Sequence, residues 1–310
     1  MNDFIDKILK GDKRYISKAI SIVENGEDER ENLLEGIYQY TGNAYRIGIT
    51  GPPGAGKSTL TNCLVKKLQS LGYKIGVIAV DPTSPFTGGA LLGDRIRMSE
   101  VSLLDGVFIR SMATRGSLGG LSKNVVEACD ILDAAGKDFI IIETVGVGQS
   151  ELDIAETADT TVVVLVPESG DSVQQLKAGL MEIADIFVLN KSDRLGADGI
   201  AASLKNIIHL KPATEDKWDI NVLKTIADRG EGTDELLKEI TRHREHLNRT
   251  GFFEIKRKEH IKKKIIELVN GKLQIHFWTE AKKKILEEHI MKIYEKTENP
   301  YTFSRKIIGT

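Results

Sequence analysis

Hydrophobic positions along the chain change their spacing twice. In residues 1–40 they recur at helical spacing on two segments that break near Gly11 and Gly26. Short apolar runs then alternate with segments of helical length, and these runs lie at 47–50, 75–81, 107–110, 139–143, 161–167, 185–190 and 220–223. From about Ile240 the helical spacing returns. The pattern predicts a helical part at 1–44, an α/β part at 45–239 and a helical part at 240–310.

Several of the short runs are apolar at every position. The stretches 140–142 and 162–164 contain only isoleucine and only valine. Strands that read this way are buried on both faces, which is typical of a parallel sheet covered by helices on each side. Strands that alternate with helices also indicate βαβ units. We therefore predict an α/β fold with a mostly parallel central sheet.

Two apolar stripes in the last part need a surface to cover them. They begin at Ile261 and Ile285, and runs of three lysines at 262–264 and 282–284 sit between the apolar positions. Lysine on the outer face of an amphipathic helix is usually solvated, so we expect no nucleic-acid partner. We expect the stripes to pack on the α/β part or on a second subunit.

Composition narrows the class of protein. The chain has 310 residues, 41% of them hydrophobic, two cysteines and a net charge of −2. The length and the two cysteines exclude a disulfide-stapled miniprotein, and the hydrophobic fraction excludes a disordered chain. The small net charge gives no strong electrostatic attraction to nucleic acids or membranes. No apolar run approaches the ~20 residues of a membrane helix. The first residues resemble neither a secretion signal nor a transit peptide, so we expect a cytoplasmic protein with no membrane partner.

A phosphate-binding loop follows the first predicted strand. Residues 51–58 fit the pattern GxxxxGK[ST] at every required position, with Thr59 next in the helix. Loop amides and the helix N-terminus would surround the phosphates, Lys57 would reach the β and γ oxygens, and Ser58 would ligate Mg²⁺. The predicted nucleotide contacts are Gly51, Pro52, Pro53, Gly54, Ala55, Gly56, Lys57, Ser58 and Thr59.

A carboxylate ends the fourth predicted strand. Glu143 follows four apolar residues, which is the Walker B arrangement, and it would complete the Mg²⁺ shell with Ser58. Gly146 follows shortly after and can donate its N–H to a γ-phosphate. We expect Lys57, Glu143 and Gly146 to be the catalytic residues. No Gln follows Gly146 directly, so the attacking water is poorly held and hydrolysis should be slow without a partner.

A base-reading motif follows the sixth predicted strand. The residues Asn190, Lys191, Ser192 and Asp193 match NKxD. Asp193 can accept hydrogen bonds from N1–H and N2–H₂ of guanine, and adenine has neither donor in that geometry. The Lys191 stem can lie across the ring. The sequence therefore predicts GTP and GDP as ligands in preference to ATP.

A further guanine contact is expected in the turn after the seventh predicted strand. The predicted residues are Ile226, Ala227 and Asp228. The usual motif there is a Ser-Ala turn whose backbone contacts the base. The serine is absent from this chain, so the N–H of Ala227 is the group that we predict to contact the guanine.

Other segments resemble a known family over nearly the whole chain. They are RIGIT at 46–50, DPTSPFTGG at 81–89, LGDRIRM at 92–98, GGL at 119–121 and ETVGVGQSE at 143–151. With the motifs above they closely resemble the MeaB/ArgK (MMAA-like) family of metallochaperone-class P-loop GTPases. Members of that family are chaperones of adenosylcobalamin-dependent methylmalonyl-CoA mutase and related acyl-CoA mutases.

The resemblance implies an architecture and roles. It implies an N-terminal helical extension, a G domain and a C-terminal helical arm through which two subunits form a homodimer. It implies Mg²⁺ with GTP or GDP, no bound cobalamin on this chain, and an acyl-CoA mutase as partner. Asp81 and Asp94 would approach the Mg²⁺ during the nucleotide cycle. The coupling segment, residues 167–177, would transmit the nucleotide state to the mutase through Glu168, Asp171, Gln174, Gln175 and Lys177.

The sequence departs from the family's pattern in two places, and other functions stay open. One departure is the missing serine before Ala227, and the other is Glu168-Ser169, where the family often has Gly-Ala. One alternative is a kinase that acts on a periplasmic-transport protein. It is disfavoured because Asp193 selects guanine and no catalytic-loop aspartate is recognisable. The other is a nickel-insertion GTPase, which would call for Cys or His ligands near the phosphate loop.

Overall fold

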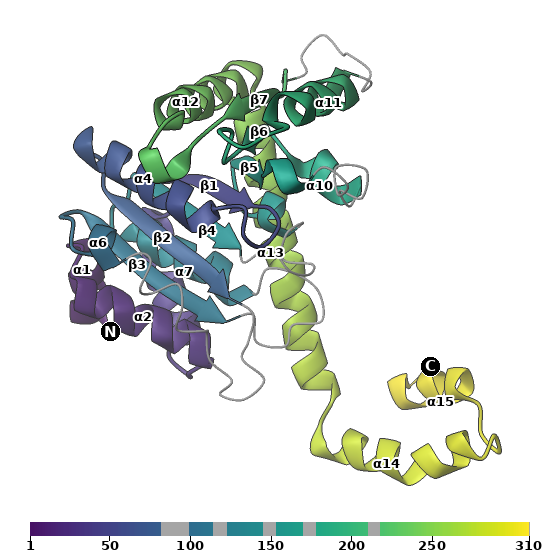
Figure 1. Ribbon diagram of the computed structural model, residues 1–310. Coiled ribbons are helices and arrows are strands. Elements are labelled where there is room, and N and C mark those ends of the chain that lie inside the picture. Colours follow the sequence, from purple (N-terminus) through teal and green to yellow (C-terminus); the bar gives the residue numbers. More distant parts are fainter. Residues whose placement is uncertain (82–98, 114–122, 145–152, 170–177, 210–217, 310) are drawn as a thin grey trace. The chain divides into compact units, whose positions relative to one another are not determined.

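Figure 1 shows the computed structural model, which describes residues 1–81, 99–113, 123–144, 153–169, 178–209 and 218–309. The strands are β1 (Tyr45–Thr50), β2 (Ile75–Asp81), β3 (Val107–Ala113), β4 (Phe139–Thr144), β5 (Thr160–Leu165), β6 (Ile186–Leu189) and β7 (Asn221–Lys224). The first helices are α1 (Asn2–Leu9), α2 (Lys13–Asn25), α3 (Arg30–Ile37), η1 (Tyr38–Tyr40), α4 (Lys57–Ser70), α6 (Ser99–Ser102) and α7 (Lys123–Ala134). The later ones are η2 (Ile154–Glu156), η3 (Pro167–Ser169), α10 (Ala178–Ile183), α11 (Ala197–His209), η4 (Ala227–Arg229), α12 (Thr233–Thr250), α13 (Phe252–Phe277), α14 (Glu280–Tyr294) and α15 (Pro300–Ile308).

The seven strands form one sheet in the order β3-β2-β4-β1-β5-β6-β7. Each pair of neighbours is parallel, with Ile47 of β1 beside Ile141 of β4 and Ile49 beside Val162 of β5. Every residue of β1, β4 and β5 is buried, as the uninterrupted apolar runs predict. The expected α/β class with a mostly parallel sheet is therefore confirmed.

Helices cover both faces of the sheet, and alternate strand residues supply the two cores. On one face α4 and α12 pack over a cluster that includes Ile47, Ile141 and Val162. On the other face α1, α2, α3 and α7 pack over a cluster that includes Ile140, and α11 packs over one that includes Phe187. Figure 1 shows α1, α2 and α7 on the side of the sheet away from α4 and α12. Because β1 lies at the centre, the loop that follows it sits in the middle of the carboxyl edge.

The N-terminal helices end where the sequence pattern breaks. Asp12 caps α2, and its carboxylate accepts hydrogen bonds from the backbone N–H of Arg14 and of Tyr15. The helix stops at Gly26, which has a left-handed φ of 68° that few other residues adopt. The buried side chains of α2 then pack against α7, so the extension joins the core of the α/β part.

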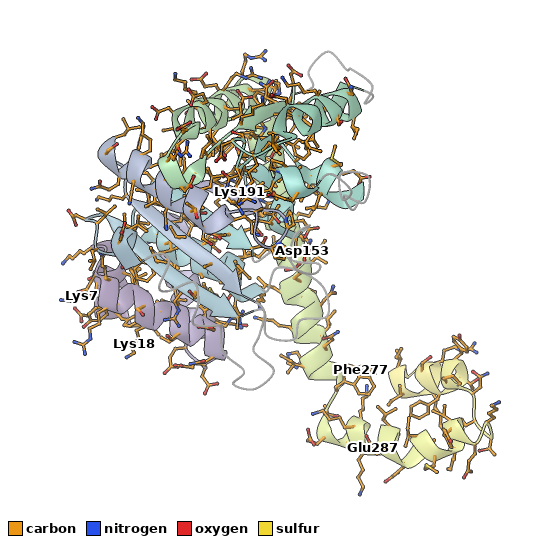
Figure 2. All side chains as sticks on the ribbon, in the orientation of Figure 1. Lys7, Lys18, Asp153, Lys191, Phe277 and Glu287 are labelled. Carbon is orange, nitrogen blue, oxygen red and sulfur yellow. The ribbon has the colours of Figure 1, made fainter. Side chains whose placement is uncertain are left out.

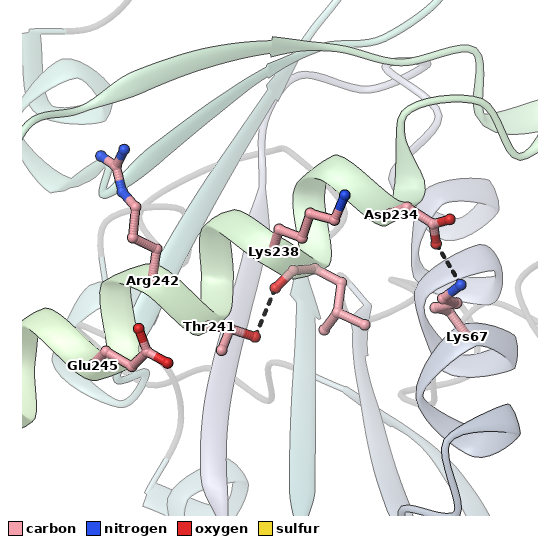
Figure 3. A pocket seen from close by; sticks show the side chains of 7 residues that line it. Lys67, Asp234, Lys238, Thr241, Arg242 and Glu245 are labelled. Atoms are coloured by element: carbon pink, nitrogen blue, oxygen red, sulfur yellow. Dashed lines mark hydrogen bonds and ion pairs between the residues drawn. The ribbon is translucent and has the colours of Figure 1, made fainter.

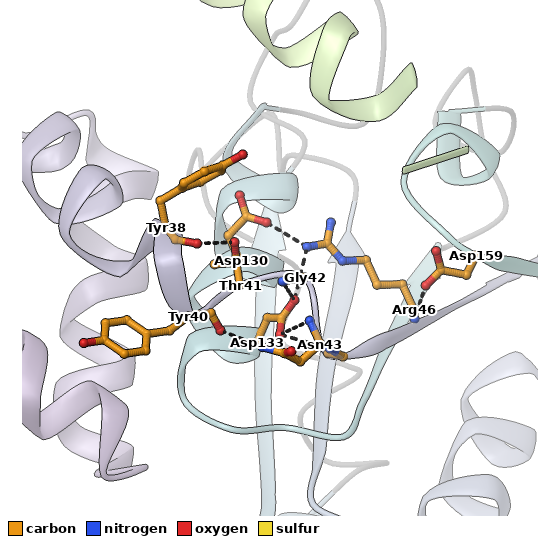
Figure 4. Close-up of polar contacts among 10 residues, drawn as sticks. Tyr38, Tyr40, Thr41, Gly42, Asn43, Arg46, Asp130, Asp133 and Asp159 are labelled. Atoms are coloured by element: carbon orange, nitrogen blue, oxygen red, sulfur yellow. Dashed lines mark hydrogen bonds and ion pairs between the residues drawn. The ribbon is translucent and has the colours of Figure 1, made fainter. Parts of the chain in front are cut away.

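A buried carboxylate attaches the segment between the N-terminal helices and β1 (Figure 4). Asp133 of α7 accepts hydrogen bonds from the backbone N–H groups of Gly42, Asn43 and Ala44 at 2.8, 3.1 and 3.0 Å. Arg46 lies beside it and pairs with Asp130 at 2.7 Å. Burial works against a charge on Arg46, but its contacts with Asp130 and the charges of neighbouring groups that include Asp159 together raise the pKa of the guanidinium. These groups hold the entry to β1 in one place.

The chain divides into two compact units, Met1–Phe253 and Glu254–Thr310. In the first unit α12 buries Leu236 and Ile240 against the sheet. In α13 and α14, which the structure describes completely, no residue is buried. Among the described residues no helix is both long and apolar enough to cross a membrane. The functional division at 1–44, 45–239 and 240–310 stays a prediction.

We expect Asp133→Ala to lower the free energy of unfolding by about 3–5 kcal/mol, because it leaves three backbone N–H groups without their charged acceptor. The matched control is Asp12→Ala, which removes an exposed carboxylate that also accepts two backbone N–H groups and should cost about 1 kcal/mol. Urea unfolding of the two variants and the parent protein measures both values. Equal losses would show that the Asp133 contacts do not hold this segment.

Candidate functional site

The phosphate loop, residues 51–58, leaves β1 and enters α4 through unusual backbone. Gly51 has a φ of 137°, and a Cβ placed there would lie 2.1 Å from the carbonyl oxygen of Val164 in β5. Any side chain at this position would therefore collide with the neighbouring strand. Gly56 also has a left-handed φ, 86°, and its Cβ would meet the side chain of Asn190. Both glycines are needed for the loop to turn tightly between its neighbours.

Lys57 begins α4 and points back into this loop. It is buried, and its Nζ donates hydrogen bonds to the carbonyl oxygens of Gly51 at 2.7 Å and Pro52 at 2.9 Å. An ammonium group held by backbone carbonyl oxygens inside the phosphate loop can contact the oxygens of a bound phosphate chain. The side chain of Lys57 thus lies in the phosphate loop, and its contact with phosphate oxygens stays a prediction.

Ser58 and Glu143 meet although they are far apart in the sequence. The Ser58 hydroxyl donates to Oε1 of Glu143 at 2.5 Å, and Glu143 is buried at the carboxyl end of β4. Beside them the Thr144 hydroxyl donates to that of Thr50 at 2.9 Å. A hydroxyl and a carboxylate side by side at the start of a helix form the oxygen donor set that Mg²⁺ prefers. The residues present therefore fit a magnesium ion.

The side-chain amide of Asn190 connects three loops. Its Nδ2 donates to the carbonyl oxygen of Ala55 at 2.9 Å. Its Oδ1 accepts from the hydroxyl of Thr225 and from the backbone N–H of Ala227, each at 3.0 Å. Asn190 is 2% exposed, so these hydrogen bonds form away from water. They fix the phosphate loop, the loop after β6 and the turn after β7 relative to one another.

The predicted base-reading residues face the same region. Lys191 has a left-handed φ of 55°, and its Nζ donates to the carbonyl oxygen of Gly54 at 2.9 Å (Lys191 is labelled in Figure 2). Asp193 is partly exposed, and one of its oxygens lies 3.9 Å from the guanidinium of Arg229. Its carboxylate is thus within reach of a ligand from solvent. A guanine contact by the Ala227 N–H, which donates to Asn190, stays a prediction.

Three residues with contacts in this region were not found from the sequence. Thr225 bonds Asn190, Arg229 lies near Asp193, and the Cys63 thiol donates to the carbonyl oxygen of Ala227 at 3.1 Å. Burial raises the pKa of Cys63, which favours the neutral thiol that can donate this bond. Of the three, only Thr225 could be expected from the sequence, because it lies in the short turn after the seventh strand, where a guanine contact is predicted.

Several predicted residues lie outside the described residues. They are Asp94, Gly146, Asp171, Gln174, Gln175 and Lys177. Asp81 ends β2, but its side chain is likewise outside the described part of the chain. Glu168, at the start of the coupling segment, forms an ion pair with Arg194, and this hydrogen bond lowers the pKa of the exposed carboxyl.

A surface hollow of about 490 Å³ lies between α4 and α12 (Figure 3). An ion pair between Lys67 and Asp234, 2.7 Å long, crosses it. The hollow contains none of the predicted nucleotide-binding residues, and its lining is Lys67, Asp234, Leu237, Lys238, Thr241, Arg242 and Glu245. It is separate from the candidate site.

The fold and the loops at its carboxyl edge define a class. A parallel sheet with a phosphate loop after its central strand, a Walker B carboxylate on the neighbouring strand and an NKxD loop is the arrangement of a P-loop GTPase. Residues 16–282 match the family described as "Methylmalonyl Co-A mutase-associated GTPase MeaB", and this chain belongs to that family.

Known proteins with similar sequences carry related names. A predicted GTPase of Pyrococcus abyssi is 49% identical over 310 residues, which cover 99% of this chain and 96% of that protein. The GTPase ArgK of Escherichia coli is 37% identical and covers 80% of this chain and 77% of its own length. The methylmalonic aciduria type A homolog of Mus musculus, a mitochondrial protein, is 34% identical and covers 89% and 72%.

One solved structure is similar over almost all of the chain. It is the crystal structure of a LAO/AO transport system kinase, with a TM-score of 0.74 and 27% identity, and it covers 99% of this chain and 95% of its own. Together with the sequence relatives it supports the assignment as a P-loop GTPase, which hydrolyses GTP.

Proposed function

We propose that the protein hydrolyses GTP at the phosphate loop and uses this cycle to protect, load or reactivate an adenosylcobalamin-dependent methylmalonyl-CoA mutase or a related acyl-CoA mutase. The observation that carries the nucleotide part is the Asn190 amide, which joins the phosphate loop to both predicted base-reading segments. The mutase part rests on the family's description and on the name of the mouse relative.

The chemistry at the phosphates is mainly the stabilisation of charge. Lys57 and the loop amides would hold the β and γ oxygens as negative charge spreads over them in the transition state. Ser58 and Glu143 would hold Mg²⁺, with Asp81 and Asp94 as further acids in the cycle. The metal, when bound, neutralises charge on the β and γ oxygens. Gly146 would donate its N–H to the γ-phosphate, and water would be the nucleophile.

A partner would supply what the chain lacks. Without a Gln next to Gly146, no side chain in that position orients the water, and hydrolysis by the protein alone should be slow. The coupling segment, 167–177, follows β5 at the carboxyl edge, on which the phosphate loop also lies. Contact of a mutase with this segment could align the site and raise the rate. We expect no bound cobalamin, no nucleic acid and no membrane, and a cytoplasmic location.

The C-terminal unit, Glu254–Thr310, is proposed to join two subunits. Its helices expose a series of large apolar side chains, which are Ile255, Ile261, Ile265, Ile266, Val269, Leu273, Ile275, Ile285, Ile290, Met291 and Tyr294. A soluble protein rarely leaves so much apolar surface in contact with water. A second copy of the same unit offers a matching surface in a symmetric homodimer.

A kinase that acts on a transport protein is the second candidate, and the name of the similar solved structure favours it. The two functions differ in the acceptor of the γ-phosphate. Hydrolysis releases all of the ³²P label of γ-labelled GTP as inorganic phosphate, whereas a kinase transfers label to protein when its substrate is present.

We expect the protein to bind GTP and GDP and to bind ATP at least about 10²-fold more weakly, because the Asp193 carboxylate pairs with donors that adenine lacks. Asp193→Asn should shift the preference to xanthine nucleotides, since the amide can donate to the oxygen that replaces the guanine amino group. Titration calorimetry with GDP, ADP and XDP measures this. Equal affinity of the parent protein for GDP and ADP would refute the guanine assignment.

We expect the full chain to be a dimer and a chain that ends at Phe253 to be a monomer. This end point keeps α12, whose Leu236 and Ile240 belong to the core. In the full chain, Ile265→Glu should also weaken the dimer, because it places a charge in the apolar surface, while Gln274→Glu adds the same charge at an exposed polar position as a control. Light scattering gives the mass of each; a dimeric 1–253 chain would place the interface elsewhere.

We expect a cobalamin-dependent acyl-CoA mutase to raise the rate of phosphate release by about 10²-fold, which needs about 2.7 kcal/mol of transition-state stabilisation. Asp171→Ala with Lys177→Ala should remove this stimulation and leave the basal rate nearly intact. Lys205→Ala, an exposed lysine of α11, is the control that should keep it. Lys57→Ala should abolish turnover in both conditions. If the mutase neither binds nor changes the rate in any nucleotide state, the chaperone role is wrong.

A further inference from the structure

If Asp193 recognises guanine, as proposed above, its carboxylate must be held in one orientation. A carboxylate discriminates guanine only when both oxygens lie in the plane of the base, one toward N1–H and one toward N2–H₂. The Asp193 side chain is 39% exposed, so water competes for its oxygens and the group can rotate. Selection of the base therefore depends on what holds this carboxylate in place.

Three cationic side chains lie in this loop or next to it, and two of them have other partners. Lys191 donates to the carbonyl oxygen of Gly54 at 2.9 Å. Arg194 pairs with Glu168. The guanidinium of Arg229 lies 3.9 Å from Oδ2 of Asp193, at the outer limit of an ion pair. Arg229 is thus the cation of these three that faces the predicted base reader.

The backbone that carries Arg229 is held by the same turn that is predicted to contact the guanine. Arg229 ends η4, and its N–H donates to the carbonyl oxygen of Ile226 at 2.9 Å. Ile226 is in turn paired with Glu231 through backbone hydrogen bonds of 3.1 and 3.2 Å. At the start of η4, the N–H of Ala227 is bound by the Asn190 amide. The position of Arg229 is therefore set by the turn after β7, which is itself hydrogen-bonded to the loop that carries Asp193.

We propose that Arg229 is a positioning residue for guanine selection. Its guanidinium approaches the Asp193 carboxylate from the turn after β7 and restrains its rotation, so that both oxygens stay available to the edge of the base. The two loops that read the base are joined by this ion pair at the solvent side and by Asn190 in the interior. Arg229 acts on the base through Asp193 and contributes nothing to the phosphate chemistry.

The expected effect is small and specific. An ion pair between exposed groups is worth at most about 1 kcal/mol, which corresponds to about a five-fold change in affinity. Arg229→Ala should therefore weaken GDP binding about five-fold, leave the weak binding of ADP unchanged and raise the KM for GTP without lowering kcat. Arg229→Lys should recover part of the loss, because it keeps the charge but not the planar fork. Higher salt should reduce the difference in GDP affinity between Arg229→Ala and the parent protein, because salt screens an exposed ion pair.

The experiment is a double-mutant cycle on the full-length protein. The dissociation constants of GDP and ADP are measured by titration calorimetry for the parent, Arg229→Ala, Asp193→Asn and the double variant. The control is Arg194→Ala, which removes one positive charge from the same region but spares the contact with Asp193. If Arg229 acts through Asp193, Arg229→Ala has no further effect on GDP in the Asp193→Asn background, and Arg194→Ala leaves GDP affinity at the parent value.

Each other result overturns the proposal. An equal loss with and without Asp193 would mean that Arg229 acts independently of the carboxylate, and an equal loss in Arg194→Ala would mean a general effect of positive charge. If the parent protein prefers GDP to ADP and Arg229→Ala leaves GDP affinity unchanged, the role of Arg229 is refuted and the guanine assignment stands. A parent protein without that preference would instead refute the guanine assignment itself.

Discussion

The buried amide of Asn190 is the contact on which the rest of the candidate site depends. One side-chain amide has a partner in the phosphate loop and two in the turn after β7, and it belongs itself to the loop after β6. These loops follow β1, β6 and β7, which lie in the same half of the sheet. A loop has little regular hydrogen bonding of its own, so a shared buried amide is an effective way to hold three loops in one arrangement. Loss of one of these partners would take a hydrogen bond away from the buried amide of Asn190.

A second set of buried polar groups lies at the start of β1. Asp133 and Arg46 attach the segment before β1 to α7, and β1 is the strand that leads into the phosphate loop. The strand is therefore held at its start by charged groups and at its end by the packing of Gly51 against Val164. With both ends fixed, the phosphate loop has a rigid support, which a site for charge stabilisation needs.

The two compact units differ in how far they bury their apolar side chains. In the first unit the helices of both faces bury them against the sheet, including those of α12. In α13 and α14 no residue is buried, and many of their large apolar side chains are exposed. The first unit has a complete core of its own, whereas the second has unsatisfied apolar surface. This contrast is the physical ground for the proposal that one unit carries the nucleotide chemistry and the other joins two subunits.

The sequence by itself determined the sheet and the main motifs, and only the tertiary structure decided how they meet. The seven strands, the phosphate loop and NKxD were predictable because periodicity and motif spacing are local properties of the chain. Only the structure shows the contact of Ser58 with Glu143, the partners of Asn190 and the approach of Arg229 to Asp193, because each joins residues from segments far apart in the sequence. The pattern that returns near Ile240 also did not reveal that α12 buries Leu236 and Ile240 in the core whereas no residue of α13 is buried. Helical spacing shows which face of a helix is apolar, but the surface that covers this face is set by the fold of distant segments.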